Sequence, residues 1–169
     1  MGNRLQRLFK HRWLDEWNTR RAIPPATVER LAQYVAESER RHTGEVRIYV
    51  EAGLPLSYLW RDATPRDRAI ALFGKLRVWD TEQNNGVLIY LLLAEHAIEV
   101  VADRGLSRHV TPAQWQEIVA HMRDEFRAGR YEEGLKQAVD EVTALLVKHF
   151  PAASDAPNAN ELPDHPVLG

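Results

Sequence analysis

Residues 84–105, NNGVLIYLLLAEHAIEVVADRG, decide the fold of this chain. The stretch 87–93 is apolar without alternation, which is typical of a central strand that is covered on both faces. The polar pair at 95–96 can turn the chain, so residues 97–102 are predicted to form an antiparallel partner strand. A β-hairpin therefore lies at the centre of the predicted fold.

Further elements on both sides of this hairpin complete an α/β unit. Alternating apolar residues predict another strand over 46–50. Helices are expected over 26–41, 65–77, 112–128 and 131–150, and Thr-Pro capping signals open two of them. A strand, a helix and the next strand form a right-handed β-α-β unit. We predict a three-layer α/β sandwich, in which a small mixed β-sheet carries helices on both faces.

Charge is unevenly distributed along the 169 residues, although the formal net charge is only −2. Residues 1–21 carry six basic and two acidic side chains, whereas residues 151–169 carry three acidic side chains and no lysine or arginine. We divide the chain into a basic amphipathic N-terminal helix (1–21), an α/β domain (22–150) and a Pro-rich tail (151–169). The tail is expected to be extended or disordered, and packing back or serving as a peptide ligand are both open to it.

Several classes of protein are excluded by what the sequence lacks. Without cysteine there is no disulfide scaffold, thiol nucleophile or cysteine zinc site, and no histidine pair has zinc-ligand spacing. No phosphate-binding loop predicts a nucleotide cofactor, and the near-neutral charge does not favour nucleic acid. The longest apolar run has eight residues, where a bilayer span needs about 20. The expected compartment is the cytoplasm.

A candidate site follows from the hairpin. Register counting pairs Leu88 with about Asp103, which brings residues 103–105 to the edge where 84–86 enter the sheet. The polar groups predicted to converge there are Asp80, Glu82, Asn84, Asn85, Asp103 and Arg104. Carboxylate and amide oxygens are hard donors that suit Ca²⁺ or Mg²⁺. The alternative is ordinary turn chemistry at 84–86 with a surface ion pair between Asp103 and Arg104.

A second candidate surface lies in the N-terminal segment. Leu5, Phe9, Trp13 and Trp17 recur every four residues on a basic background. A helix with this pattern can lie on an anionic membrane or dock on a partner protein. It can equally cover an open face of its own domain, and the sequence leaves the two readings open.

Four ordered motifs resemble the TPM-domain family, which includes thylakoid-lumen acid phosphatase, photosystem-repair proteins and many membrane-anchored bacterial relatives. The motifs are GEV at 44–46, NNGVL at 84–88, DRGL at 103–106 and FRAGRYEEGL at 126–135. The resemblance covers residues 24–150 and implies an α/β sandwich. It also implies divalent-cation binding near the NNG edge, with Asp80, Asn84, Asn85 and Asp103 as site residues, and in some members weak acid-phosphatase activity.

More narrowly, RVWDTE at 77–82 and the ending at 161–168 resemble a short, anchorless bacterial branch of this family. Its members are often encoded beside LemA-type membrane proteins and a longer TPM protein, which implies a protein partner of that kind. One departure is Arg130, where the family often has an acidic residue.

Two hypotheses follow. The first is a cytoplasmic, non-catalytic module that binds a divalent cation and a protein partner near the inner membrane, with Arg104 orienting the site or contacting an anion. The alternative is a metal-assisted acid phosphatase acting on phosphomonoesters. Whether the chain is an enzyme is not decided by the sequence.

Overall fold

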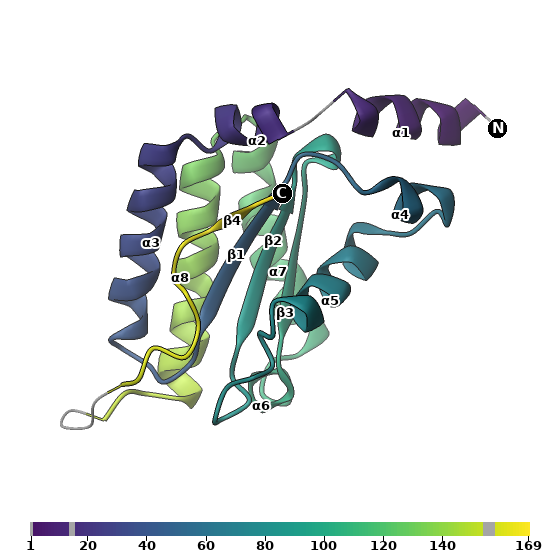
Figure 1. Cartoon of the computed structure of the whole chain (residues 1–169). Coiled ribbons are helices and arrows are strands. Elements are labelled where there is room, and N and C mark those ends of the chain that lie inside the picture. Colours follow the sequence, from purple (N-terminus) through teal and green to yellow (C-terminus); the bar gives the residue numbers. More distant parts are fainter. Residues whose placement is uncertain (1, 14–15, 154–157) are drawn as a thin grey trace.

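A four-stranded mixed sheet with strand order β3-β2-β1-β4 forms the middle layer of the structure, and helices cover both of its faces (Figure 1). This computed structural model describes residues 2–13, 16–153 and 158–169. The strands are β1 (Val46–Glu51), β2 (Val87–Leu92), β3 (Ala97–Ala102) and β4 (Val167–Leu168). The helices are α1 (Gly2–Arg12), α2 (Glu16–Ala22), α3 (Pro25–Glu39), α4 (Leu56–Trp60), α5 (Pro65–Lys75), α6 (Arg104–Ser107), α7 (Pro112–Arg127) and α8 (Tyr131–His149), with a short 3₁₀ turn at Leu93–Glu95.

Strand β2 is the centre of the core. All six of its residues are fully buried, which confirms the prediction of a strand covered on both faces. Alternate side chains point to opposite layers. Val87, Ile89 and Leu91 pack in the cluster that contains α3, α7 and α8 residues, whereas Leu88, Tyr90 and Leu92 pack with residues of α4 and α5. The predicted three-layer sandwich is therefore confirmed.

The hairpin register differs from the predicted one by two residues. Leu88 pairs with Val101 rather than with about Asp103. The difference arises because the connection is the 3₁₀ turn at Leu93–Glu95 followed by His96 in a left-handed conformation (φ 49°), which moves the centre of the hairpin back by one residue. A shift of two leaves every side chain on its predicted face, so the layers are unaffected.

Two helices begin as their capping signals predict. The Thr64 and Thr111 hydroxyls each accept the backbone N–H three residues on, and Asp67 and Gln114 return the hydrogen bond to the cap backbone N–H. These reciprocal bonds satisfy donors that a helix start otherwise leaves unpaired. They fix where α5 and α7 begin, and hence how both helices lie against β3.

The segments at the two ends of the chain pack on the domain. Residues 158–169 run along β1, and Val167 and Leu168 pair with Tyr49 and Val50 in parallel. The predicted N-terminal helix is two helices, α1 and α2, in the part of the chain that the structure describes. Residues 1, 14–15 and 154–157 of the two predicted terminal segments lie outside the described residues. Within the described ranges, no helix combines the length and apolar character needed to cross a bilayer.

Candidate functional site

The predicted site lies at the end of the sheet where β2 begins, and the structure brings its two segments together. The Asp103 N–H donates to Gly86 O at 2.9 Å, and the Gly105 N–H donates to Asn84 O at 2.8 Å. Glycine at 105 permits this approach, and glycine at 86 lets the same loop pass close to Val78. A Cβ on Gly86 would lie 1.9 Å from Val78 O, and a Cβ on Gly105 would lie 2.3 Å from Asn84 O.

Asn85 is fully buried, and its side chain is held in one orientation. The Thr43 hydroxyl donates to Gln83 Oε1 at 3.0 Å, so it accepts a hydrogen bond from Asn85 Nδ2 at 3.2 Å. This chain of bonds places the amide nitrogen of Asn85 toward Thr43. The amide oxygen, Asn85 Oδ1, is buried and has no hydrogen-bond partner among the described residues.

The second buried oxygen without a partner belongs to Asp103. Its carboxylate caps the short helix α6, because Oδ1 accepts the Arg104 backbone N–H at 2.7 Å. Only 9% of the residue is exposed, and its buried Oδ2 accepts no hydrogen bond from the described residues. Buried polar atoms in folded proteins are nearly always paired, so each of these two acceptors is open to a donor or a cation.

The other predicted ligands are exposed. Asp80 pairs with Arg77 at 3.1 Å and points into solvent. Glu82 is exposed, and its backbone N–H donates to the Glu161 carboxylate at 3.0 Å. Asn84 is exposed in a left-handed conformation (φ 52°), which is the turn chemistry considered above. The structure therefore buries two of the predicted ligands, Asn85 and Asp103, and leaves three at the surface.

The donor set at this edge is limited. Among the described residues, no group of three or more histidine, aspartate or glutamate side chains is placed to hold a metal ion. A cation here would take one carboxylate oxygen, one amide oxygen and backbone or water oxygens. Such hard ligands fit Ca²⁺ or Mg²⁺ and not zinc.

Arg104 extends from the same edge. Its guanidinium is exposed, and within the described residues it makes no hydrogen bond or ion pair. The surface ion pair with Asp103 that the sequence allowed is not present between these two residues, because Asp103 binds the backbone N–H of Arg104 instead. Arg104 is therefore free to contact an anion.

Sequence reasoning missed a buried acidic pair beside this site. The Glu45 carboxylate accepts the backbone N–H groups of Glu161 and Leu162 at 3.1 Å each, and Glu39 Oε1 accepts the Val46 N–H at 2.8 Å. Burial and the neighbouring Glu45 raise the pKa of Glu39 to about 9. Glu45 therefore holds the C-terminal segment beside β1, and Glu39 ties α3 to the start of β1. The only sequence signal was the GEV motif at 44–46, which by itself did not indicate this role.

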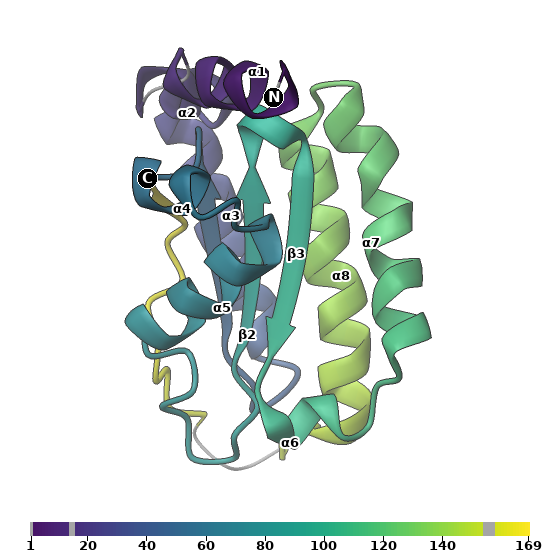
Figure 2. The ribbon, with the colours of Figure 1, turned by 90° about the vertical axis from the view of Figure 1, so that its right-hand side faces the viewer.

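The N-terminal stripe is exposed. Leu5, Phe9, Trp13 and Trp17 keep 60, 64, 82 and 65% of their surface exposed. Helix α1 is attached through other residues, since Arg7 Nε and His11 Nε2 both contact Glu95 Oε1, at 2.8 and 2.9 Å. In Figure 2 this helix lies across the end of the sheet next to α4. These four side chains therefore do not cover a face of their own domain.

Comparisons with known proteins agree with this architecture. The family model for the TPM domain, which carries the name TPM phosphatase, matches residues 18–145. The structure resembles the NMR structure of the BA42 protein from the psychrophilic bacterium Bizionia argentinensis, with a TM-score of 0.75 and 23% identity over 87% of this chain and 95% of that one. It also resembles the N-terminal domain of a protein from P. gingivalis, with a TM-score of 0.61 and 22% identity over 76% of this chain and 81% of that one. No curated protein matches the sequence significantly.

Proposed function

Because this chain belongs to the TPM domain family, we propose that it is a non-catalytic TPM module that binds a divalent cation between Asn85 and Asp103. The observation that supports the proposal is the pair of buried oxygens, Asn85 Oδ1 and Asp103 Oδ2, that have no donor among the described residues. Both sit on segments whose backbones are hydrogen-bonded to each other, so the two ligands are held before the ion arrives.

Asp103 supplies the negative charge of this site and Asn85 supplies a neutral oxygen whose direction is fixed by Thr43. A bound Ca²⁺ or Mg²⁺ would satisfy both oxygens at once and offset the cost of burying them. Exposed Asp80 and Glu82 are close in sequence, and we assign them a supporting electrostatic role rather than direct contact. The site uses no zinc and no nucleotide cofactor.

The test is a thermal melt of EDTA-treated protein titrated with Ca²⁺ or Mg²⁺. An ion at 100 times its Kd stabilises the folded state by about 2.7 kcal/mol, which raises the Tm by several degrees at this size. Asp103→Asn keeps a helix-capping oxygen and removes the charge, so this variant should lose the shift. Asp80→Asn is the matched control and should keep it. An unchanged Tm in the wild-type protein with both ions would refute the proposal.

We further propose that the exposed N-terminal stripe is the surface through which the module meets its partner, in the cytoplasm beside the inner membrane. The same segment also carries four exposed basic side chains, Lys10, Arg12, Arg20 and Arg21. This composition fits an anionic lipid surface or an acidic protein face. A LemA-type membrane protein or a longer TPM protein is the partner that the family branch suggests.

Co-sedimentation with vesicles distinguishes the two targets of this surface. A double substitution, Phe9→Ser with Trp13→Ser, should abolish binding to vesicles of anionic lipid if the target is the membrane. If the target is protein, wild-type protein stays in the supernatant and the same variant instead loses complex formation with the LemA-type candidate. Both substitutions are at exposed positions, so an unchanged melt is the control for folding.

A second candidate function is metal-assisted hydrolysis of phosphomonoesters. It is favoured by the free guanidinium of Arg104, which extends from the edge that holds Asn85 and Asp103. A cation there would polarise the phosphate, and Arg104 would stabilise its remaining charge. Turnover of p-nitrophenyl phosphate that requires Mg²⁺ or Ca²⁺, and that both Asp103→Asn and Arg104→Ala remove without unfolding the protein, would favour the enzyme. Background hydrolysis alone would favour the non-catalytic module.

A further inference from the structure

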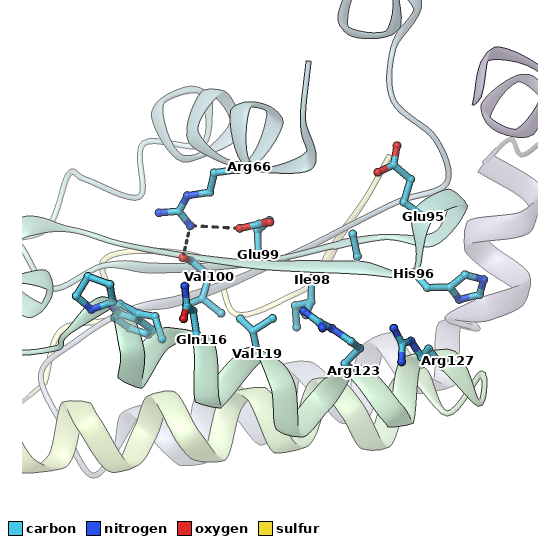
Figure 3. A pocket seen from close by; sticks show the side chains of 13 residues that line it. Arg66, Glu95, His96, Ile98, Glu99, Val100, Gln116, Val119, Arg123 and Arg127 are labelled. Atoms are coloured by element: carbon cyan, nitrogen blue, oxygen red, sulfur yellow. Dashed lines mark hydrogen bonds and ion pairs between the residues drawn. The ribbon is translucent and has the colours of Figure 1, made fainter. Parts of the chain in front are cut away.

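The free edge of the sheet forms a groove away from the proposed cation site. Strand β3 is the last strand on that side, with α5 against one face and α7 against the other (Figure 2). The groove between these helices has a volume of about 690 Å³ and follows residues 97–100 of β3. Figure 3 shows Arg66 of α5 on one wall, and Gln116, Val119, Arg123 and Arg127 of α7 on the other.

Strand β3 presents unpaired backbone groups to this groove. The Asp103 N–H bonds to Gly86 O, so the alternation of an antiparallel ladder turns Ala97, Glu99 and Val101 toward β2. Ile98 and Val100 therefore carry outward backbone groups. Arg66 Nη1 donates to Val100 O at 2.6 Å, whereas the Ile98 N–H, the Ile98 carbonyl and the Val100 N–H have no partner among the described residues.

These three groups specify the kind of ligand. A donor, an acceptor and a donor spaced along an extended strand are matched together by another extended polypeptide, in either direction. The same device is present at the opposite edge of this sheet, where residues 158–169 lie along β1 and add β4. The edge at β3 has no such covering segment within the described chain.

The side chains of the groove specify its polarity. The Val100 end is lined by Val119 and Trp115, which are half-buried apolar side chains. The Ile98 end faces Arg123 and Arg127, one helical turn apart, and neither guanidinium has a hydrogen bond or ion pair within the described residues. The acids of the groove are already paired, Glu99 with Arg66 and Glu95 with Arg7. The unmatched charge is therefore positive.

We propose that β3 binds an extended acidic peptide of a partner protein as a fifth strand of the sheet. The peptide would place an apolar side chain against Val119 and Trp115 and an aspartate or glutamate against Arg123 and Arg127. Arg66 limits the ladder to three hydrogen bonds, because it already holds the Val100 carbonyl. This surface is separate from the N-terminal stripe and stands whether or not a cation binds at Asn85 and Asp103.

The first experiment is selection from a randomised seven-residue peptide library against the whole protein. Wild-type protein should enrich sequences that contain acidic and apolar residues and lack proline. The variant Arg123→Glu/Arg127→Glu should not enrich them. The matched control Lys75→Glu/Lys148→Glu makes the same change in net charge at exposed positions outside the groove and should enrich the wild-type set. No enrichment, or equal enrichment by the groove variant, would overturn the proposal.

The second experiment tests backbone pairing with the strongest selected peptide. In the bound state, hydrogen exchange of the Ile98 and Val100 amides should slow at least tenfold. Two versions of the peptide, N-methylated at odd or at even positions, should behave differently: one should lose more than tenfold in affinity and the other should bind normally, since alternate amides of a strand face its neighbour. Equal effects of both versions would indicate side-chain contact without strand addition and overturn the proposal. Protection of the two amides at high protein concentration without peptide, together with a dimer in sedimentation, would assign the edge to a second copy and also overturn it.

Discussion

Two buried polar clusters of this molecule differ in how completely their atoms are paired. In the α5 layer, both Glu51 oxygens are occupied: Arg68 donates to them at 2.6 and 3.0 Å, and the Tyr90 hydroxyl donates at 2.8 Å. At the end of β2, Asn85 Oδ1 and Asp103 Oδ2 have no donor among the described residues. A saturated cluster holds the fold together and has nothing left to offer a ligand. An unsaturated one is stable only because the rest of the fold holds it, and it is suited to binding.

The largest effect should come from breaking the saturated cluster. Arg68→Ala leaves the Glu51 carboxylate buried without its cation, which should lower the free energy of unfolding by about 3 kcal/mol. The measurement is urea unfolding at pH 7. The control is Arg30→Ala, which removes an exposed ion pair with Glu132 and should have a much smaller effect. Equal losses of stability would show that the Glu51 cluster stabilises the fold no more than an exposed ion pair does.

The acidic pair Glu39 and Glu45 is intermediate between these two clusters. Glu39 forms no ion pair with a cationic side chain of the described residues, and a bound proton neutralises it instead. Burial and Glu45 raise the pKa of Glu39 from 4.5 to about 9, and Asp164 adds to the shift. Between pH 4.5 and 9 the folded protein keeps the Glu39 proton that the unfolded chain releases. The Glu39 contribution to the free energy of unfolding is therefore highest below pH 4.5 and decreases as the pH rises toward 9. Glu39→Gln keeps the acceptor for Val46 and removes the titration, so it should stabilise the protein at pH 8 by about 2 kcal/mol.

The check on Glu39 is a series of melts from pH 5 to pH 9. Wild-type Tm should fall across this range more steeply than the Tm of Glu39→Gln. The two curves should meet near pH 5, where the wild-type carboxyl is protonated. Parallel curves over the whole range would show that Glu39 has no raised pKa.

How far the sequence predicts these clusters depends on whether the contacts follow from strand pairing. Strand β2, its hairpin and the capped helix starts all follow from local patterns, and the meeting of 84–86 with 103–105 follows from the hairpin even with a register wrong by two. Outside the strands, local patterns do not show which side chains of a loop turn inward. The sequence therefore does not indicate that Asn85 is buried and Asn84 exposed.

The Glu51 cluster lies beyond what sequence reasoning predicted. Its three residues come from β1, α5 and β2, and Arg68 reaches Glu51 only because α5 packs on the β2 and β3 side of the sheet. A tyrosine inside an otherwise apolar strand was the available signal, since a buried hydroxyl needs a partner. The pairing of Val167 and Leu168 with β1 depends in the same way on Glu45 and Arg47, which hold the segment before it at Leu162 and Pro163.

The effect of Asp103→Asn on stability should change sign when the cation is added. In EDTA, the change removes a buried charge with no partner for Oδ2, and it should stabilise the protein by about 1 kcal/mol. In saturating Ca²⁺ or Mg²⁺, wild-type protein should be the more stable of the two. Crossing Tm curves over the titration would be the signature of a binding residue. Loss of stability in EDTA would instead give Asp103 a structural role like that of Glu51.

The smallest effect should come from Asp80→Asn. A small effect would show that Asp80 lies near the cation without contacting it. Asp80 is about half exposed and paired only with Arg77, so the substitution should change the free energy of unfolding by less than about 0.5 kcal/mol. Cation affinity, measured by calorimetry, should change by less than about threefold, because water screens a charge at this position. A tenfold loss would mean that the 80–84 loop moves inward when the ion binds and places Asp80 on it. In that case the resting geometry shows only part of the ligand set, and burial would no longer distinguish Asp103 from its exposed neighbours.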